Sequence, residues 1–284
     1  EGFEELAPAP YPLATDIKVG GISMKEHPDL VQVKSQTLDM EKAELTTCMV
    51  FNPAPDQAVE IEVVQFASRA IPCLLCQQIT LKSDMPVTLE LGTYIDTEGT
   101  FELNEIIGYK PSLIPRQIPV LTRGFSSNRG SRLGIAVLVS RPHISEVPQE
   151  QPGQLKITLA PGVEQVVHTM ASMVSDIYHK DPHLEALRLV RWAGMNRFDR
   201  LREKNRNDWA SLWKSRIKVK GCDPKDQRML DAAFYYHQSN IHQASRCGYP
   251  PFGLTQNWAY WGSLFWDMDL WTLIPAILVQ PEAA

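Results

Sequence analysis

Short β-rich runs follow one another from about residue 15 to residue 176, separated by Pro, Gly, Asn and Asp. Val, Ile, Thr and aromatic residues favour strands, whereas the separating residues favour turns. In the run Ala58 to Ala67, apolar residues alternate with Glu60 and Glu62, which predicts a strand with one face in solvent. We therefore expect a large antiparallel β sandwich. The other expected strands are Glu44 to Phe51, Val87 to Leu91, Leu133 to Val139, Leu155 to Leu159 and Gln165 to Met170.

Helical signals replace the strand signals near Asp181. Pro182 suits a first helical turn, and apolar residues then recur at helical spacing from Leu184 onward. Trp209 and Trp213 lie four residues apart in a polar stretch, so they share one face of a helix. We expect these two indoles to pack against protein rather than to stack on a ligand.

A further helix is predicted after Asp223, which supplies an N-cap followed by Pro224 at the first helical position. One predicted face includes His237, which we expect to be a hydrogen-bonded core histidine rather than a metal ligand, because His242 points elsewhere. The later run LWTLIPAILVQ resumes as a helix despite Pro275. The apolar face of the helix predicted after Asp223 is expected to contain Met229, Leu230, Ala233, Phe234, His237 and Ile241.

Composition excludes several kinds of partner. Lys and Arg number 28 against 33 Asp and Glu, for a net charge of -5, so the basic field that nucleic-acid binding needs is absent. No apolar run approaches the roughly 20 residues of a membrane span, and the start lacks the features of a signal peptide. The chain does not begin with Met and stops directly after an apolar run, so we expect both ends to be cut from something longer.

Cysteine usage favours a reducing compartment and hence the cytoplasm, although the compartment stays open. Five scattered cysteines do not resemble a dense disulfide framework. Cys73 and Cys76 have the spacing of a redox or zinc motif, but no second pair or His cluster completes it. They fall in a run that reads as a buried strand, so we interpret them as packing residues. No metal and no organic cofactor is expected, because His and Cys do not cluster with ligand spacing.

The segment Tyr260 to Asp269 (YWGSLFWDMD) concentrates aromatic and acidic residues. Sugar rings stack on aromatic side chains, and their hydroxyls donate charge-assisted hydrogen bonds to carboxylates. Trp266 and Asp267 supply both groups side by side. Composition alone leaves open a second interpretation, in which a Trp-rich helix start packs into a core with Asp267 or Asp269 as its N-cap.

Asp267 and Asp269 do not suit a catalytic pair. Glycosidases place two carboxyls on opposite sides of the scissile bond, about 5 to 9.5 Å apart. Residues i and i+2 point to different sides of a helix, and two acids from one turn approach the sugar from one side. Asp267 is therefore interpreted as a carboxylate that holds the substrate, with the proton donor on another element.

These residues give the chain a resemblance to glycoside hydrolase family 65, whose members are hydrolases and phosphorylases of α-glucosides. Weaker similarities extend into the β region, so the resemblance spans nearly the whole chain. The most specific matches are Gly253-Leu254-Thr255, Tyr260, Gly262, Phe265-Trp266-Asp267, Asp269, Pro275 and Gln280 to Ala284.

The resemblance implies a multidomain β and α architecture. Residues 1–180 would form an antiparallel β super-sandwich, residues 181–218 linker helices, and residues 219–284 the truncated start of an (α/α)6 catalytic barrel. It also implies that Trp266 and Asp267 bind the glucosyl unit, and that the general acid is a Glu beyond Ala284. No catalytic residue is therefore expected within the chain. The full set of substrate-binding candidates is Tyr260, Phe265, Trp266, Asp267 and Asp269.

Two departures from the family pattern bear on the reaction. Ser263 stands where the family usually has His, and Asp269 stands where many phosphorylases have Glu. Hydrolase members more often carry Asp followed by an aliphatic residue and Trp, as in Asp269-Leu270-Trp271. The sequence thus favours hydrolysis of an α-linked glucoside, with inversion. A phosphorylase and a noncatalytic carbohydrate-binding or structural β domain stay as alternatives, and a homo-oligomer is compatible with the sequence.

Overall fold

The computed structural model describes residues 9–55, 57–100, 103–105, 120–127, 130–142, 153–246, 270–271 and 273–283. The chain divides into two compact units. The larger consists of Pro10–Asp39 and Ala43–Asn205, and the smaller consists of Glu1–Ala9, Met40–Lys42 and Arg206–Ala284. The passage from one unit to the other at Asn205 falls inside the helix α2 (Phe198–Leu212).

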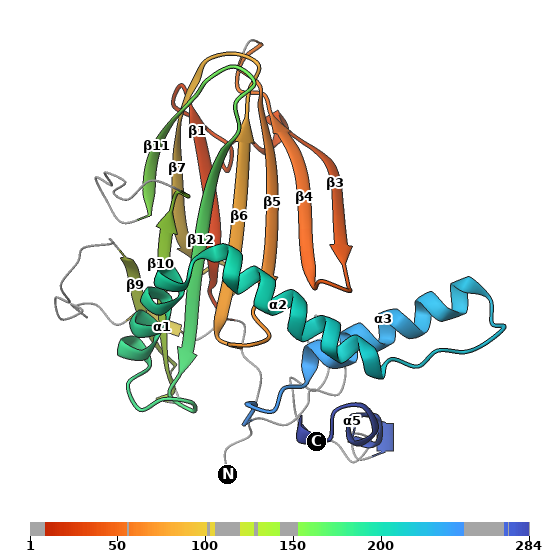
Figure 1. The fold of residues 1–284 in the computed structure, drawn as a ribbon. Coiled ribbons are helices and arrows are strands. Elements are labelled where there is room, and N and C mark those ends of the chain that lie inside the picture. The colour runs from red at the N-terminus through yellow and green to blue at the C-terminus, as the bar shows by residue number, and fades with distance from the viewer. Residues whose placement is uncertain are drawn as a thin grey trace. The chain divides into compact units, whose positions relative to one another are not determined.

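The larger unit contains two antiparallel sheets, which Figure 1 shows stacked on each other. One sheet has four strands in the order β11-β7-β1-β2, and the other has eight in the order β3-β4-β5-β6-β12-β10-β9-β8. The predicted antiparallel sandwich is thereby confirmed. The strands are β1 Tyr11–Val19, β2 Ile22–Ser23, β3 Val31–Asp39, β4 Glu44–Phe51, β5 Val59–Ala67, β6 Leu74–Lys82, β7 Val87–Asp96, β8 Leu103–Glu105, β9 Val120–Ser127, β10 Arg132–Ser140, β11 Gln154–Leu159 and β12 Gln165–Ser175.

Alternation along the strands produces the core between the sheets. On β5, Val59 and Ile61 are buried while Glu60 and Glu62 are exposed, as predicted. Burial of aliphatic side chains from both inner faces is the main favourable contribution to folding, at about 25 cal/mol per Å² of apolar surface removed from water. The larger inner cluster is Ile17, Val19, Phe51, Val59, Ile61, Ile79, Leu81, Val87, Leu89, Leu91, Val139, Leu155, Ile157, Leu159 and Val167. A smaller one contains Leu13, Phe125, Ile135, Val137 and Ala171.

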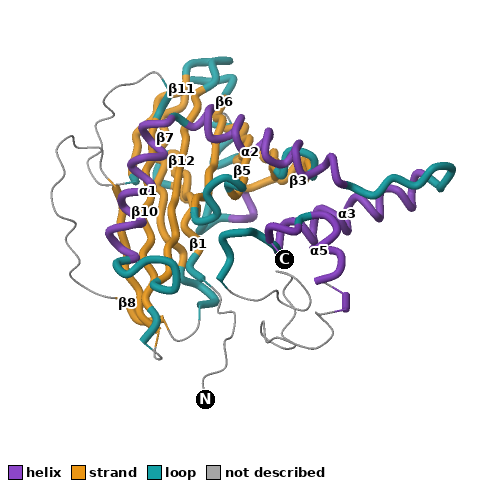
Figure 2. The backbone as a smooth tube through the Cα atoms, turned by 60° about the horizontal axis from the view of Figure 1, so that its bottom comes forward, coloured by secondary structure: helices purple, strands orange, loops and turns teal. Residues whose placement is uncertain are grey.

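Helix α1 (Pro182–Asn196) covers the other face of the eight-stranded sheet, as Figures 1 and 2 show. The predicted helix start is confirmed, because the Asp181 carboxylate accepts a hydrogen bond from the Leu184 amide at 3.1 Å. Ala186, Val190 and Ala193 pack on the sheet. The first turn of α2 joins the same cluster, which consists of Phe66, Leu74, Cys76, Ala136, Leu138, Met170, Val174, Ala186, Val190, Ala193, Phe198 and Leu201.

Two glycines let the first turn of α1 approach the sheet. Gly124 on β9 and Gly134 on β10 are paired in register. A Cβ atom on Gly134 would lie 2.6 Å from the Cα of His183, and one on Gly124 would lie 2.8 Å from the Nδ1 of that histidine. Ordinary van der Waals contact needs well over 3 Å. The glycine pair therefore forms a notch in the sheet that receives Pro182 and His183.

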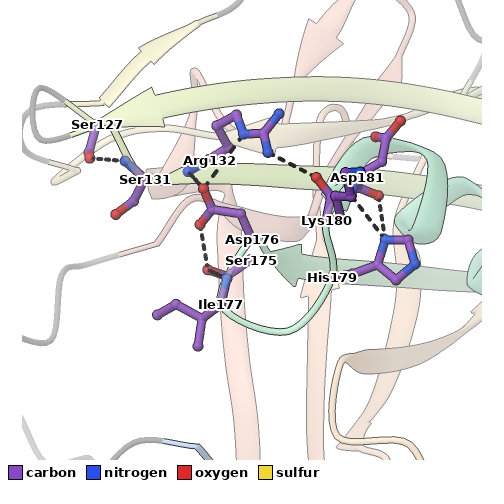
Figure 3. A network of polar contacts seen from close by, with 9 residues as sticks. All are labelled: Ser127, Ser131, Arg132, Ser175, Asp176, Ile177, His179, Lys180 and Asp181. Atoms are coloured by element: carbon purple, nitrogen blue, oxygen red, sulfur yellow. Dashed lines mark hydrogen bonds and ion pairs between the residues drawn. The ribbon is translucent and has the colours of Figure 1, made fainter.

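A polar network fixes the segment between β12 and α1 (Figure 3). The amide of Arg132 donates to the Asp176 carboxylate at 2.9 Å, and its guanidinium donates to the Lys180 carbonyl at 2.9 Å. The Asp181 amide donates to the Nδ1 of His179 at 3.1 Å. These bonds hold the chain reversal that places Asp181 at the start of α1.

A buried ion pair joins α2 to the start of β4 within the larger unit. Arg202 donates through Nε and Nη2 to the two carboxylate oxygens of Glu44, at 2.9 and 2.8 Å. The Glu44 side chain is only 4% exposed. A bidentate geometry of this kind offsets the desolvation of both charges. Nearby, the Asn205 side chain accepts from the Arg69 amide at 2.9 Å.

The described helices are too short or too polar to span a bilayer. In the smaller unit they are α3 (Pro224–Asn240) and α5 (Leu273–Val279), with the short 3-10 helices η2 (Trp213–Ser215) and η3 (Pro281–Ala283). A further 3-10 turn, η1 (Pro28–Leu30), precedes β3 in the larger unit.

We expect Gly134→Ala to destabilise the protein by at least 2 kcal/mol, because the added methyl meets backbone atoms of Pro182 and His183 that cannot move without lifting α1. The matched control is Gly92→Ala on β7, where a Cβ meets nothing within 4 Å. We expect that change to be neutral or stabilising by about 0.5 kcal/mol. Urea unfolding measures both variants, and equal effects would contradict the notch.

The buried His168 makes stability depend on pH. Its ring stacks on Phe198 with centroids 4.1 Å apart, and burial lowers its pKa to about 4. The unfolded chain, with a His pKa near its usual 6.5, therefore binds a proton that the folded chain does not between those values. We expect the free energy of unfolding to fall by about 1.4 kcal/mol per pH unit from this group as pH drops from 6.5 toward 4.

The variant His168→Phe keeps a ring against Phe198 and removes the titration. We expect its urea midpoint at pH 7 to fall, because Gln78, whose Oε1 is 3.3 Å from the His168 Nε2, loses that contact. Its loss of stability between pH 6.5 and 4.5 should be smaller than that of the wild type. An identical pH dependence in both proteins would show that His168 does not contribute.

Candidate functional site

The predicted substrate-binding residues Tyr260, Phe265, Trp266, Asp267 and Asp269 all lie outside the described residues. The structure does describe the elements on both sides of them in the chain. Helix α3 precedes the segment, and Leu270, Trp271 and helix α5 follow it. The geometry of the site is therefore built from these flanking elements.

Helix α3 begins as predicted. The Asp223 carboxylate accepts from the Lys225 amide at 2.7 Å, and Pro224 occupies the first helical position. Asp226 adds a negative charge in the first turn, where the helix dipole favours it. The start of α3 is thus determined by local chemistry.

The buried face of α3 differs from the predicted one. Phe234 and Ile241 are buried as expected, but Met229 is 64% exposed and Leu230 is 37% exposed. Gln238, which the prediction omitted, is fully buried. Apolar periodicity predicted a broad buried face. In the structure α3 packs mainly through the side that contacts Trp209 and Trp213.

Aromatic pairs hold α3 within the smaller unit. The Trp213 and Phe234 rings have centroids 5.0 Å apart, and those of Trp209 and Tyr235 lie 5.1 Å apart. Trp209 and Trp213 are only 4% and 9% exposed. Trp213 also donates from Nε1 to the Met40 carbonyl at 3.1 Å. The predicted packing role of both tryptophans is confirmed.

A charged group that the sequence did not reveal lies beside this aromatic cluster. The Arg216 guanidinium is 3.6 Å from the Asp231 carboxylate and 3.7 Å from that of Glu41, and it lies over the Trp213 ring at 5.7 Å. Gln227 adds hydrogen bonds from its Nε2 to Asp231 and to the Ile217 carbonyl, both at 2.9 Å. Nothing in the spacing of these residues signals that they meet.

Helix α5 confirms the predicted continuation through Pro275. Pro275 lies within this helix (Leu273–Val279), and Leu270 and Trp271 are also helical. Ala276 is buried, and its carbonyl accepts from the Gln280 amide at 2.7 Å. Trp271 is 75% exposed and Leu278 is 76% exposed, so the apolar outer face of this helix has no cover within the described residues.

The predicted packing role of the cysteine motif is confirmed at both positions. Cys76 on β6 is fully buried, and burial raises the pKa of its thiol to about 12, which makes it a poor nucleophile or ligand at neutral pH. Cys73 lies in the turn before β6, which begins at Leu74, and packs half-buried against the hydrophobic cluster that also contains Cys76. Within the described ranges, His, Cys, Asp and Glu do not gather in groups of three or more that could hold a metal.

We expect Phe234→Ala to destabilise α3 by about 3 kcal/mol, because it removes a buried ring against Trp213. Met229→Ala is the matched control on the same helix, and its exposed side chain predicts a change within about 0.5 kcal/mol. Hydrogen exchange of peptides from residues 224–240 measures the local effect. Equal exchange rates in the two variants would contradict the aromatic anchoring of α3.

Comparisons with known proteins give the chain its relatives. The family model for the N-terminal domain of glycosyl hydrolase family 65 matches residues 1–212. Kojibiose hydrolase from Mucilaginibacter mallensis is 25% identical over 283 residues, covering 90% of this chain and 39% of that protein. Kojibiose hydrolase from Flavobacterium johnsoniae is 33% identical over 115 residues, covering 40% and 17%.

A solved structure from the human microbiome, described as a kojibiose phosphorylase, has the same fold. It superposes with a TM-score of 0.76 at 15% identity, covering 98% of this chain and 38% of that one. The chain therefore spans well under half the length of these relatives. Since the family model covers residues 1–212 of 284, and the antiparallel sandwich agrees with it, the chain belongs to glycosyl hydrolase family 65.

Proposed function

We propose that the protein containing this chain acts on an α-glucosidic bond, and that Trp266 and Asp267 hold the glucosyl unit. Membership of glycosyl hydrolase family 65 is the observation that carries this proposal. Kojibiose is an α-linked glucose disaccharide, and two relatives are kojibiose hydrolases. An indole and a carboxylate at adjacent positions supply ring stacking and charge-assisted hydrogen bonds to the sugar hydroxyls.

The proposed reaction is hydrolysis with inversion. One carboxylic acid outside this chain protonates the glycosidic oxygen, and a second carboxylate activates a water on the opposite face of the ring. Asp267 orients the glucosyl ring for that attack, while Tyr260, Phe265 and Asp269 line the same pocket. Such chemistry needs no metal or cofactor. The Asp269-Leu270-Trp271 sequence and the two hydrolase relatives favour hydrolysis over phosphorolysis, which is the second candidate.

We also propose the three-part organisation that the family resemblance implies. Residues 1–180 form the super-sandwich, residues 181–218 the linker helices, and residues 219–284 the start of an (α/α)6 barrel. Helices α3 and α5 support the last assignment through their exposed apolar side chains, since soluble proteins rarely leave such faces uncovered. The side chains concerned are Met229, Tyr236, Trp271, Ile274, Ile277 and Leu278.

The central assay supplies kojibiose, nigerose and trehalose to the whole protein in the presence and absence of inorganic phosphate. The proposal predicts phosphate-independent release of glucose, with the glucose from the non-reducing side appearing first as the β-anomer by NMR. Formation of glucose 1-phosphate that depends on added phosphate would contradict hydrolysis and show that the reaction is phosphorolysis. The purified 284-residue chain alone should show no turnover, because the proton donor is expected beyond Ala284.

Substitutions test the assigned roles. We expect Asp267→Asn to lower kcat/KM by at least a hundredfold, because a charge-assisted hydrogen bond to the sugar is lost, and Trp266→Ala to raise KM through lost stacking. Trp192→Ala is the control, since this Trp on α1 is 37% exposed in the larger unit. Full activity of the Asp267→Asn variant would show that Asp267 does not bind the substrate.

A further inference from the structure

An extended segment of the smaller unit connects the 3-10 helix η2 to helix α3. Arg216, at its start, has φ -62° and ψ 147°, which is extended backbone, and Gly221, at its end, turns the chain with a φ of 76°. The residues between them, Ile217 to Lys220, are all exposed. Because side chains alternate along an extended chain, Ile217 and Val219 share one face and Lys218 points to the other.

Side chains of α3 and of the turn before it satisfy one edge of this segment. Gln227 donates from Nε2 to the Ile217 carbonyl at 2.9 Å, and its Oε1 accepts from the Val219 amide at 3.1 Å. The Cys222 thiol donates to the Val219 carbonyl at 3.2 Å. Gln227 thus binds the two residues that flank Lys218, in the way that a neighbouring strand of a sheet would.

Lys218 presents the opposite edge of the segment. Backbone groups of successive residues in an extended chain point to alternate edges, so the amide and carbonyl of Lys218 point away from Gln227. Neither group makes a hydrogen bond to any residue that the structure describes. An open edge of this kind is suited to pairing with a further strand.

Contacts within the smaller unit hold the segment in its extended form. The Gln227 Nε2 also donates to the Asp231 carboxylate at 2.9 Å, and that carboxylate lies 3.6 Å from the Arg216 guanidinium. Arg216 in turn lies over the ring of the buried Trp213 at 5.7 Å. A segment that is already ordered loses less conformational entropy when a partner strand binds to it.

The apolar face of the segment is uncovered. Ile217 is 61% exposed and Val219 is 48% exposed. Both are β-branched, and such residues suit the surface of a sheet. Full burial of an aliphatic side chain of this size contributes about 1.5 to 3 kcal/mol, so a partner that covers this face is favoured in addition to its backbone hydrogen bonds.

Charge decides which kind of strand fits. In an antiparallel pair, hydrogen-bonded residues lie directly opposite each other, and the residues of the open edge are Arg216, Lys218 and Lys220. A second copy of the segment would therefore place basic side chains opposite basic side chains, which is unfavourable. A strand with Asp or Glu at the facing position gains from the same geometry.

Length indicates where such a strand could come from. Kojibiose hydrolase from Mucilaginibacter mallensis shares only 39% of its length with this chain, and the kojibiose phosphorylase structure shares only 38% of its length. More than half of each relative thus has no counterpart among these 284 residues.

We propose that the Arg216–Val219 segment is a docking edge for an acidic β-strand from the part of the protein outside these 284 residues. The strand pairs with the Lys218 backbone, covers Ile217 and Val219, and places a carboxylate beside the Lys218 side chain. The pairing attaches the start of α3 to the rest of the protein. This inference rests on the proposed function, which places the chain in a longer enzyme.

Amide hydrogen exchange at single-residue resolution in the whole protein tests the docking edge. We expect the Lys218 amide to exchange at least about 100-fold more slowly than in an unstructured peptide of the same sequence. The Val219 amide, which is bonded to Gln227, is the internal reference. Exchange of Lys218 at the unstructured rate would overturn the proposal. Protection that disappears when the protein is diluted would also overturn it, because the partner would then be a second copy.

A charge reversal tests the acidic character of the partner. Lys218→Glu should speed exchange at residue 218 at least tenfold after correction for the intrinsic rate, because two carboxylates then face each other. Lys214→Glu, at an exposed position outside the segment, is the matched control and should leave Lys218 protected. Unchanged protection in Lys218→Glu would contradict an acidic partner.

Activity separates this inference from the proposed function. Hydrolysis of kojibiose by a protein whose Lys218 amide is unprotected would refute the docking edge and leave the proposed function standing. A protected Lys218 amide in a protein that does not act on α-glucosides would refute the proposed function and leave the docking edge standing.

Discussion

Burial of both faces of the central strands β6, β12 and β10 of the eight-stranded sheet is the constraint on which the larger unit depends. One face packs against the four-stranded sheet through aliphatic residues, and the other packs against α1 and the first turn of α2. Strands β6, β10 and β12 contribute to both layers, so they must be apolar on both sides. Their sequences, such as LLCQQITLK and RLGIAVLVS, are accordingly less strictly alternating than that of β5.

Close approach of α1 follows from this arrangement and depends on a few particular residues. Gly124 and Gly134 remove the side chains that would hold the helix away, and the Asp181 cap and the Arg132 network determine where it begins. The Arg202–Glu44 pair then fixes α2 against β4. In the smaller unit, the contact between the Trp213 and Phe234 rings anchors α3. This helix precedes the proposed sugar-binding segment in the sequence.

Features that depend on neighbouring residues were predicted well from the sequence. Contacts between distant parts of the chain were not. Alternation on β5 and the caps at Asp181 and Asp223 depend on neighbours within a few residues, and these predictions were confirmed. Strand β7 was predicted only to Leu91 but extends to Asp96, because pairing with β1 carries polar residues such as Thr93 into the sheet. The wrong face assigned to α3 has the same origin. Periodicity shows which residues are apolar, but it does not show which other element packs against them.

The candidate site was named from aromatic density and family resemblance, and its residues lie outside the described part of the chain. A crystal structure of the whole protein with bound glucose or kojibiose tests the central claim most directly. The account predicts a glucosyl ring stacked on Trp266, with the Asp267 carboxylate hydrogen-bonded to its hydroxyls. A glucosyl unit bound elsewhere, with Trp266 packed into a protein core and Asp267 capping a helix, would contradict it.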